Sequence, residues 1–172
     1  LERLELRLNL LVSLPELLLP TVARLLVAHD EQYDHGRALQ QMGPLEPEAD
    51  ELTELGRTLG SCLALFHFFK DKHEVNVISP NEFTQILNFL PSSDKVLVYE
   101  SNREESDVLF QEAEIIFTLD FNSLGRAKNV SYKISKSTAT IIMIDHHENP
   151  SDFATYMISN SEMSSTSEMI YD

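Results

Sequence analysis

The feature that most constrains the fold is a series of short apolar runs, separated by stretches with helical spacing. The runs are HEVNVIS, KVLVYE, EIIFTLDFN and TATIIMIDHH, at 73–79, 95–100, 114–122 and 138–147. Their apolar residues do not alternate strictly with polar ones, which is typical of strands buried on both faces. Strands of this kind that alternate with helices form parallel sheets. The sequence therefore predicts an α/β fold with a parallel sheet flanked by helices.

Helices are predicted between these strands. LGSCLALFHFF, at 59–69, offers several apolar residues to one helical face and precedes the first run. SPNEFTQILNFL and SNREESDVLFQEA each open with a serine followed three residues later by a glutamate, the pattern of a capping box. These pairs are Ser79 with Glu82 and Ser101 with Glu104. Both segments are therefore expected to form helices that start at the serine.

A third serine and glutamate pair lies near the end of the chain. Ser165 and Glu168 form a capping box within SSTSEMIYD, which predicts a helix start there. If that start faces the carboxyl ends of the strands, its free amides favour a bound phosphate. The alternative is an ordinary helix start away from any ligand.

Composition changes near residue 60. Residues 1–60 contain no Lys, Ile or Phe, whereas 61–172 contain every Lys and all nine Phe. Within the first part, leucines and valines recur at helical spacing in PELLLPTVARLLVAHDEQ, at 15–32, which predicts an amphipathic helix. We therefore expect a Leu-rich, mostly helical segment over 1–60 and an α/β domain over 61–172. The first segment is an ordinary helical subdomain, an appended module or a stretch read in another frame.

Four residues near the end of this predicted helix have the types and spacing of metal ligands. They are His29, Asp30, Asp34 and His35. Because nothing nearby in the sequence completes a site, we interpret them as the solvated end of the helix.

Charge restricts the partners of the chain. Its 172 residues carry a formal net charge of −15, which repels nucleic-acid backbones and anionic membranes. A short nucleotide held through metal ions is still compatible with this field. No uncharged apolar run approaches the about 18 residues of a membrane span. The single cysteine, Cys62, fits a reducing compartment, so we expect a cytoplasmic protein that binds neither membranes nor long duplexes.

Polar side chains follow two of the predicted strands. Asp120 ends FTLD, and Asp145, His146 and His147 end IIMIDHH. Ligands of open parallel sheets bind outside the carboxyl ends of the strands, so these tips converge if the two strands are near neighbours. Carboxylates and imidazoles together suit a divalent ion such as Mn²⁺. Two such ions clamp a phosphate and lower the pKa of a bridging water, which yields hydroxide for attack on phosphorus.

Four motifs follow one another over about residues 60–172: LGSCLALFHFFKDKHEVNVISPNEF, IIFTLDFNSLGR, IDHHENPSDFA and SSTSEMIYD. In this order they resemble the DHH phosphoesterase superfamily, most closely bacterial oligoribonucleases and phosphoadenosine-phosphate phosphatases. The resemblance implies that Asp120 bridges two Mn²⁺ ions, that His146 is a ligand of one, and that Asp145 supports the site. It also implies that His147 faces the substrate phosphate.

Two further residues are candidate substrate contacts under this resemblance. Arg126 is expected to steady a phosphate oxygen through the fork of its guanidinium, with a plain surface residue as the alternative. Asn122 is the weaker candidate. The implied substrates are short oligonucleotides or nucleoside bisphosphates.

The chain departs from the family in its first motif, which reads roughly His-x-Asn-Pro-Asp-Gly-Asp-Ala-x-Gly-Ser and supplies metal ligands. Alignment through LGS places Glu51, Leu55 and Arg57 where His, Asp and Asp are expected. Leucine cannot coordinate a hard cation, and a guanidinium repels one. The family's last metal-binding aspartate and its C-terminal substrate domain also lie beyond Asp172. We therefore expect weak metal binding and slow or absent turnover.

Three functional classes remain. The first is a phosphoesterase that uses a manganese-activated water. The second is a non-catalytic relative that keeps the fold to bind a nucleotide or a protein. The third is a hydrolase with Ser61 or Cys62 as nucleophile, which is the least favoured because both lie within a helical pattern, where Cys62 is a small buried hydrophobe.

Overall fold

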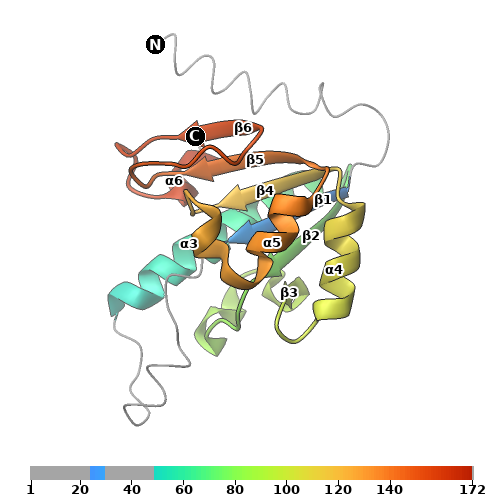
Figure 1. The fold of residues 1–172 in the computed structure, drawn as a ribbon. Coiled ribbons are helices and arrows are strands. Elements are labelled where there is room, and N and C mark those ends of the chain that lie inside the picture. Colours follow the sequence, from blue (N-terminus) through green and yellow to red (C-terminus); the bar gives the residue numbers. More distant parts are fainter. Residues whose placement is uncertain (1–23, 30–48, 172) are drawn as a thin grey trace, which may run out of the picture.

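A six-stranded parallel sheet organises the chain (Figure 1). The computed structural model describes residues 24–29 and 49–171, with side chains from residue 56 onward except that of Lys128. The strands are β1 (Arg24–His29), β2 (Glu74–Ser79), β3 (Val96–Val98), β4 (Ile115–Leu119), β5 (Thr140–Asp145) and β6 (Tyr156–Ser159). Their order is β3-β2-β1-β4-β5-β6, and every neighbouring pair is parallel. The predicted α/β architecture is confirmed.

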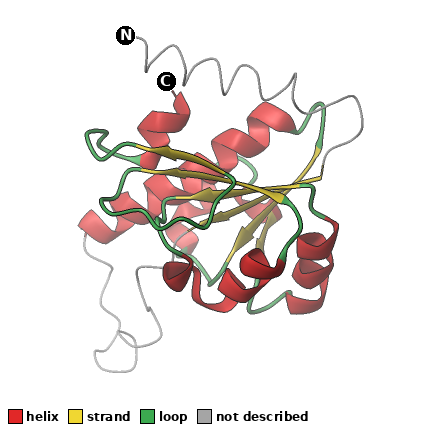
Figure 2. Cartoon of the chain, turned by 45° about the horizontal axis from the view of Figure 1, so that its top comes forward, coloured by secondary structure: helices red, strands yellow, loops and turns green. Residues whose placement is uncertain are grey.

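Helices cover both faces of this sheet (Figure 2). The helices α3 (Ala49–Phe69) and α6 (Thr166–Tyr171) lie on one face, and α4 (Arg103–Glu112) and α5 (Lys128–Lys136) lie on the other. Among the described helices, none combines the length and the apolar character that crossing a bilayer requires.

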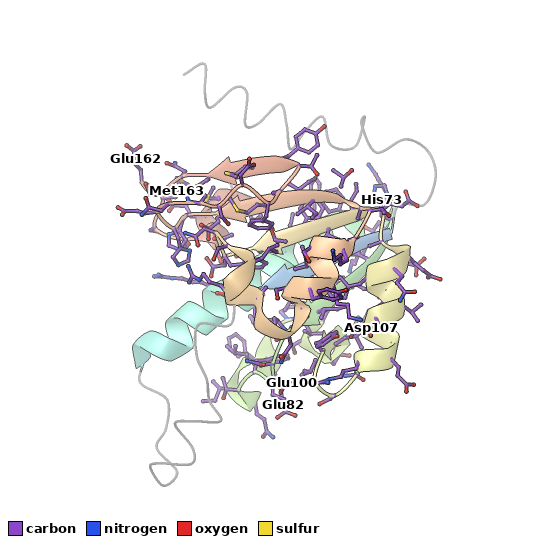
Figure 3. The ribbon with its side chains drawn as sticks, in the orientation of Figure 1. His73, Glu82, Glu100, Asp107, Glu162 and Met163 are labelled. Atoms are coloured by element: carbon purple, nitrogen blue, oxygen red, sulfur yellow. The ribbon has the colours of Figure 1, made fainter. Side chains whose placement is uncertain are left out.

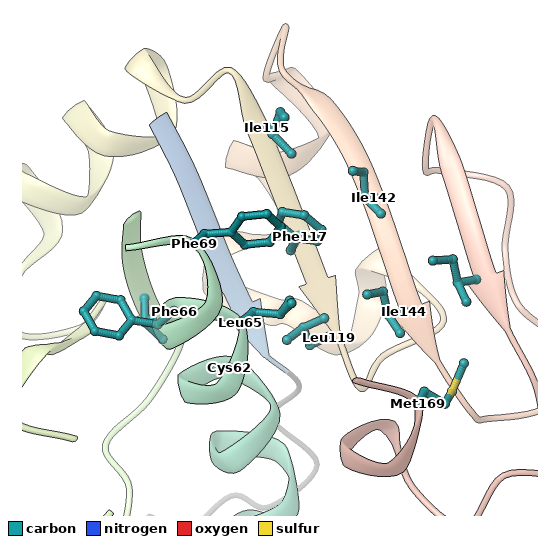
Figure 4. Packing of buried hydrophobic residues seen from close by; sticks show 12 residues of the cluster. Cys62, Leu65, Phe66, Phe69, Ile115, Phe117, Leu119, Ile142, Ile144 and Met169 are labelled. Carbon is teal, nitrogen blue, oxygen red and sulfur yellow. The ribbon is translucent and has the colours of Figure 1, made fainter. Parts of the chain in front are cut away.

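Alternate residues of β4 enter different layers of the core. Ile115, Phe117 and Leu119 pack against α3 and α6, whereas Ile116 packs in the cluster beneath α4 and α5. This alternation follows from the period of two along a strand, and it explains why β4 is apolar at almost every position. Figure 4 shows the first layer, in which the ring of Phe69 stacks on Phe117 with centroids 5.7 Å apart.

The predicted amphipathic helix over 15–32 is wrong for residues 24–29, which form the strand β1. The rest of that segment lies outside the described residues. β1 occupies the interior of the sheet, where Leu25 pairs in register with both Val75 and Ile115. Interior strands of parallel sheets are typically apolar along their length, and a short apolar run satisfies helical spacing equally well. Pairing on both sides therefore decides the conformation of these residues.

The change of composition near residue 60 falls inside α3, which runs unbroken from Ala49 to Phe69. β1, from the first part of the chain, pairs with β2 and β4 from the second. In the described part of the chain, the composition change thus does not coincide with a boundary between folded units. The origin of the first 60 residues stays a prediction.

Two predicted capping boxes do not form. Ser79 is the last residue of β2, and its carbonyl accepts a hydrogen bond from the amide of Tyr99. Because that pairing holds Ser79 in the sheet, the following helical segment is only the short 3₁₀ helix η1 (Gln85–Phe89), capped by Thr84. The second predicted helix does form as α4, but it follows Asn102, and no side chain caps it.

The third capping box forms in part. Ser165 Oγ accepts the amide of Glu168 at 3.2 Å, and α6 begins at the next residue as predicted. The carboxylate of Glu168 accepts the amide and hydroxyl of Ser164 instead of reaching back to Ser165. These two bonds hold the pKa of Glu168 below its usual value.

α5 and β6 were not predicted. α5 is largely polar and buries Val130 and Ile134, a single i and i+4 pair. β6 is a four-residue edge strand in which Ile158 is buried while Tyr156 and Met157 are exposed. α5 buries two of its described side chains and β6 buries one, so neither segment contains the run of apolar residues by which the predicted strands and helices were identified.

A polar network joins elements on the face of the sheet that α4 and α5 cover. Asp107, labelled on α4 in Figure 3, accepts hydrogen bonds from the Tyr99 hydroxyl at 2.9 Å and from Lys133 Nζ at 2.7 Å. The Lys133 ammonium is the main reason that the pKa of Asp107 lies below its ordinary value. The network joins α4 and α5 to the end of β3.

Candidate metal and phosphate site

Asp120 stands at the carboxyl end of β4 with an unusual backbone. Its φ of 67° lies in the left-handed region, which non-glycine residues adopt rarely and which is common at functional sites. The residue is 6% exposed, and its carboxylate accepts hydrogen bonds from two hydroxyls. One comes from Thr58 of α3, and the other comes from Thr166 of α6 at 2.6 Å. The first residue of α6 thus faces the end of β4.

Asp145, the last residue of β5, holds the second histidine of the triplet. It is fully buried, and its carboxylate accepts the backbone amide of His147 at 2.8 Å and the ring Nδ1 of His147 at 2.7 Å. The carboxylate favours the charged imidazolium, so the pKa of His147 lies above its usual value. In the neutral form, this bond places the ring proton on Nδ1 and leaves Nε2 as an acceptor.

His146 points toward Asp120. Its Nε2 lies 3.5 Å from Asp120 Oδ1, and its ring centroid lies 4.6 Å from that of His147. Ligand atoms of Asp120, His146 and His147 all lie within 4.8 Å of one another. The structure therefore brings together three of the predicted site residues, from the ends of two adjacent strands.

A divalent cation fits between Asp120 and His146 better than among all three residues. A carboxylate oxygen and an imidazole nitrogen 3.5 Å apart can both reach an ion at about 2.1 Å. The third donor is different, because Arg126 Nη2 lies 3.4 Å from His147 Nε2. A guanidinium at that nitrogen repels a cation and attracts an anion. Asp120 and His146 are thus the candidate ligands, and His147 with Arg126 forms a candidate phosphate contact.

Asn122 serves the backbone of the neighbouring loop. Its side-chain amide donates to the carbonyl of Glu148 at 2.5 Å, and its own carbonyl accepts both the amide and the hydroxyl of Ser151. These bonds brace the loop that follows the two histidines. A substrate contact for Asn122 stays a prediction.

The carboxyl end of β1 adjoins the same site. His29 is the last residue of β1, and its Cα is in register with Leu119, the residue before Asp120. The strand order reverses between β1 and β4, and ligands of open α/β sheets bind at this kind of switch point. The interpretation of His29 as a helix end is wrong. Asp30, Asp34 and His35 lie outside the described residues.

The residues aligned to the first family motif all fall within α3. These are Glu51, Leu55 and Arg57. Arg57 is exposed, and its carbonyl accepts the hydroxyls of Ser61 at 2.8 Å and Ser167 at 2.5 Å. The adjacent Thr58 reaches Asp120, a contact that sequence reasoning missed because no spacing rule links residues 62 positions apart. Thr166 was missed for the same reason.

The nucleophile hypothesis finds no support at Ser61 or Cys62. Cys62 is fully buried within the core cluster under α3, and burial raises the pKa of its thiol far above the usual value. Ser61 is fully buried, and its hydroxyl lies within hydrogen-bonding distance of the Arg57 carbonyl and of Ser167 Oγ. Neither group has the adjacent base and the access that a nucleophile needs.

Comparison with known proteins agrees with the fold. A model of the DHH family, N-terminal domain, matches residues 58–172. The chain is similar in structure to an exopolyphosphatase-related protein from Bacteroides fragilis, with a TM-score of 0.76 and 31% identity. That match covers 97% of this chain but 42% of the other, so the chain spans less than half the length of that protein. A comparison with curated proteins finds no match. The chain belongs to the DHH family.

Proposed function

We propose that the chain is the metal-binding part of a phosphoesterase that hydrolyses short oligonucleotides or nucleoside bisphosphates with Mn²⁺. The observation that carries the proposal is the convergence of Asp120 and His146 at the ends of β4 and β5, beside the pair of His147 and Arg126. A cation site and an anion site within one hydrogen-bonded cluster suit a phosphate ester. Membership of the DHH family supports this reaction class.

Each residue of the cluster has a separate task in this reaction. Asp120 and His146 hold the ion, and a bound divalent ion supplies a water of lowered pKa together with charge neutralisation at the phosphate. Asp145 fixes the ring of His147 and favours its protonated form. Protonated His147 then donates from Nε2 to a phosphate oxygen, and Arg126 donates to a second one.

Calorimetric titration of the purified chain with Mn²⁺ tests the metal site. We expect Asp120→Asn and His146→Ala each to weaken binding at least tenfold, because each removes one of two ligands. His73→Ala is the matched control, since this half-buried histidine directly precedes β2 and so lies at the amino end of the strands, away from the site at their carboxyl ends (Figure 3). Equal binding in all four proteins, or none in the unmodified chain, would contradict the proposed site.

His29→Ala extends the same titration to the end of β1. The substitutions in the aligned first motif predict weak binding for the chain as a whole. A further loss in this variant would mean that β1 contributes to the ion site. Unchanged binding would limit the site to β4 and β5.

Hydrolysis of a 5′-phosphorylated dinucleotide and of a nucleoside 3′,5′-bisphosphate tests the reaction. We expect slow release of mononucleotide or of phosphate with Mn²⁺, because the aligned first motif lacks its metal ligands, and none with a chelator or with Asp120→Asn. Hydrolysis that persists in both of those controls would overturn the proposal.

A non-catalytic relative is the second candidate, and one observation favours it. The hydroxyls of Thr58 and Thr166 donate to both oxygens of the Asp120 carboxylate and so compete with a cation for its lone pairs. Nucleotide binding without turnover, at saturating Mn²⁺, would select this alternative.

A further inference from the structure

A cleft of about 470 Å³ opens beside the site, between α3, η1 and α6. Its lining is mostly apolar and comes from η1 and the residue that follows it, with two polar contributors from the helices. The lining includes Ile86, Leu87, Phe89, Leu90, Arg57 and Ser167. A cleft of this volume is in the range of small-molecule sites, which combine apolar walls with a few polar groups.

η1 presents two large apolar side chains to solvent at this cleft. Phe89 is 74% exposed and Ile86 is 53% exposed, while Leu87 between them is buried. A 3₁₀ helix has three residues per turn, so positions 86 and 89 lie on the same side of η1. Two exposed hydrophobic residues that share a cleft mark a binding surface more strongly than isolated ones do.

The cleft and the Asp120 site share one wall. Thr58 and Thr166 donate to Asp120, and their chain neighbours Arg57 and Ser167 line the cleft. The hydroxyl of Ser167 donates to the carbonyl of Arg57 at 2.5 Å, which joins α3 to α6 between the two sites. Arg57 is therefore the cleft residue that directly precedes a donor to Asp120, and Phe89 lines the same cleft.

We infer that the cleft holds the nucleobase of a nucleotide whose phosphate lies near Asp120. The flat base stacks on Phe89, and the exposed guanidinium of Arg57 faces the sugar and phosphate. Neither Phe89 nor Arg57 has a role in the reaction proposed above, yet both line the cleft that adjoins the donors of Asp120. The inference rests on the proposed function for the position of the phosphate but not for the binding of the base.

Binding of adenosine 5′-monophosphate and of ribose 5-phosphate measures the contribution of the base. We expect the nucleotide to bind the unmodified chain about tenfold more tightly, because stacking on one aromatic side chain is of that order. Phe89→Ala should remove this difference and Phe89→Trp should keep it. Phe68→Ala is the matched control, because Phe68 is 64% exposed but lies near the end of α3 outside the cleft.

Adenosine alone separates this inference from the proposed function. It lacks a phosphate, and its binding without metal is followed by amide chemical shifts. We expect shifts at residues 86–90 in the unmodified chain and in Phe68→Ala, and none in Phe89→Ala. If adenosine causes these shifts but the chain neither binds Mn²⁺ nor hydrolyses the substrates, the base-binding cleft is supported and the proposed reaction is rejected. Absence of shifts with adenosine, or equal affinity for the nucleotide and for ribose 5-phosphate, would overturn the inference.

Discussion

Asp145 binds His147 twice, through the ring Nδ1 at 2.7 Å and through the backbone amide at 2.8 Å. The two bonds fix both the direction of the ring and the position of its proton, because a buried carboxylate accepts only from the protonated nitrogen. The other ring nitrogen, Nε2, then faces Arg126, whose Nη2 lies 3.4 Å away. The buried carboxylate of Asp145 thus leaves Nε2 as the ring nitrogen of His147 that is available for chemistry.

Asp145→Asn is predicted to lower the pKa of His147 in the metal-free protein. The raised pKa comes first from the bond to Asp145, so its loss returns the pKa toward about 6.5. Because the folded pKa is raised, the stabilisation is complete below the unfolded value and is lost as pH rises through the folded pKa. Titration of the ring protons by NMR, with denaturation at pH below and above this window, measures both effects. An unchanged His147 pKa in the variant would show that the bond is absent.

Thr58→Val is predicted to destabilise the metal-free chain by roughly 1–3 kcal/mol, because a buried carboxylate loses a donor. Urea denaturation measures the change in free energy of unfolding. Thr138→Val is the control, since Thr138 is exposed. If an ion binds Asp120, Mn²⁺ should restore more stability to Thr58→Val than to the control. Equal loss in both variants would speak against the hydrogen bond.

Phe117→Ala is predicted to cost about 3–5 kcal/mol, because Phe117 is fully buried in the centre of the sheet and stacks on Phe69. Phe68→Ala changes the same side chain at an exposed position and should alter the unfolding free energy by less than about 0.5 kcal/mol. The two variants compared in urea test the assignment of β4 to the core. Similar costs at both positions would mean that the core is misplaced.

Cys62 is predicted to resist thiol reagents in the folded chain. It is fully buried and its thiol pKa is strongly raised by burial, so neither the reagent nor the thiolate is available. We expect modification by a disulfide reagent only above the unfolding midpoint in urea. Rapid reaction of the native protein would revive a role for this thiol.

The four predicted strands became β2, β3, β4 and β5. The pattern is clearest in β4 and β5, which are buried almost throughout and are therefore apolar at nearly every position. The position of Asp120 at a strand end followed from the same pattern. The cap predicted at Ser79 did not form because this residue ends β2 and its carbonyl accepts the amide of Tyr99. The cap predicted at Ser101 did not form because α4 starts after Asn102 instead. α5 and β6 were missed because both are short and bury few apolar side chains.

The sequence by itself thus determined the class of fold, the strand ends and the residue types of the site. Only the tertiary structure decided that residues 24–29 form an interior strand and that Asp120 lies next to His146. It alone decided that Thr58 and Thr166, 108 positions apart, share one carboxylate. The physical reason is that local patterns report which surface a segment buries. Partners across a sheet are selected by packing between segments that are distant in the chain.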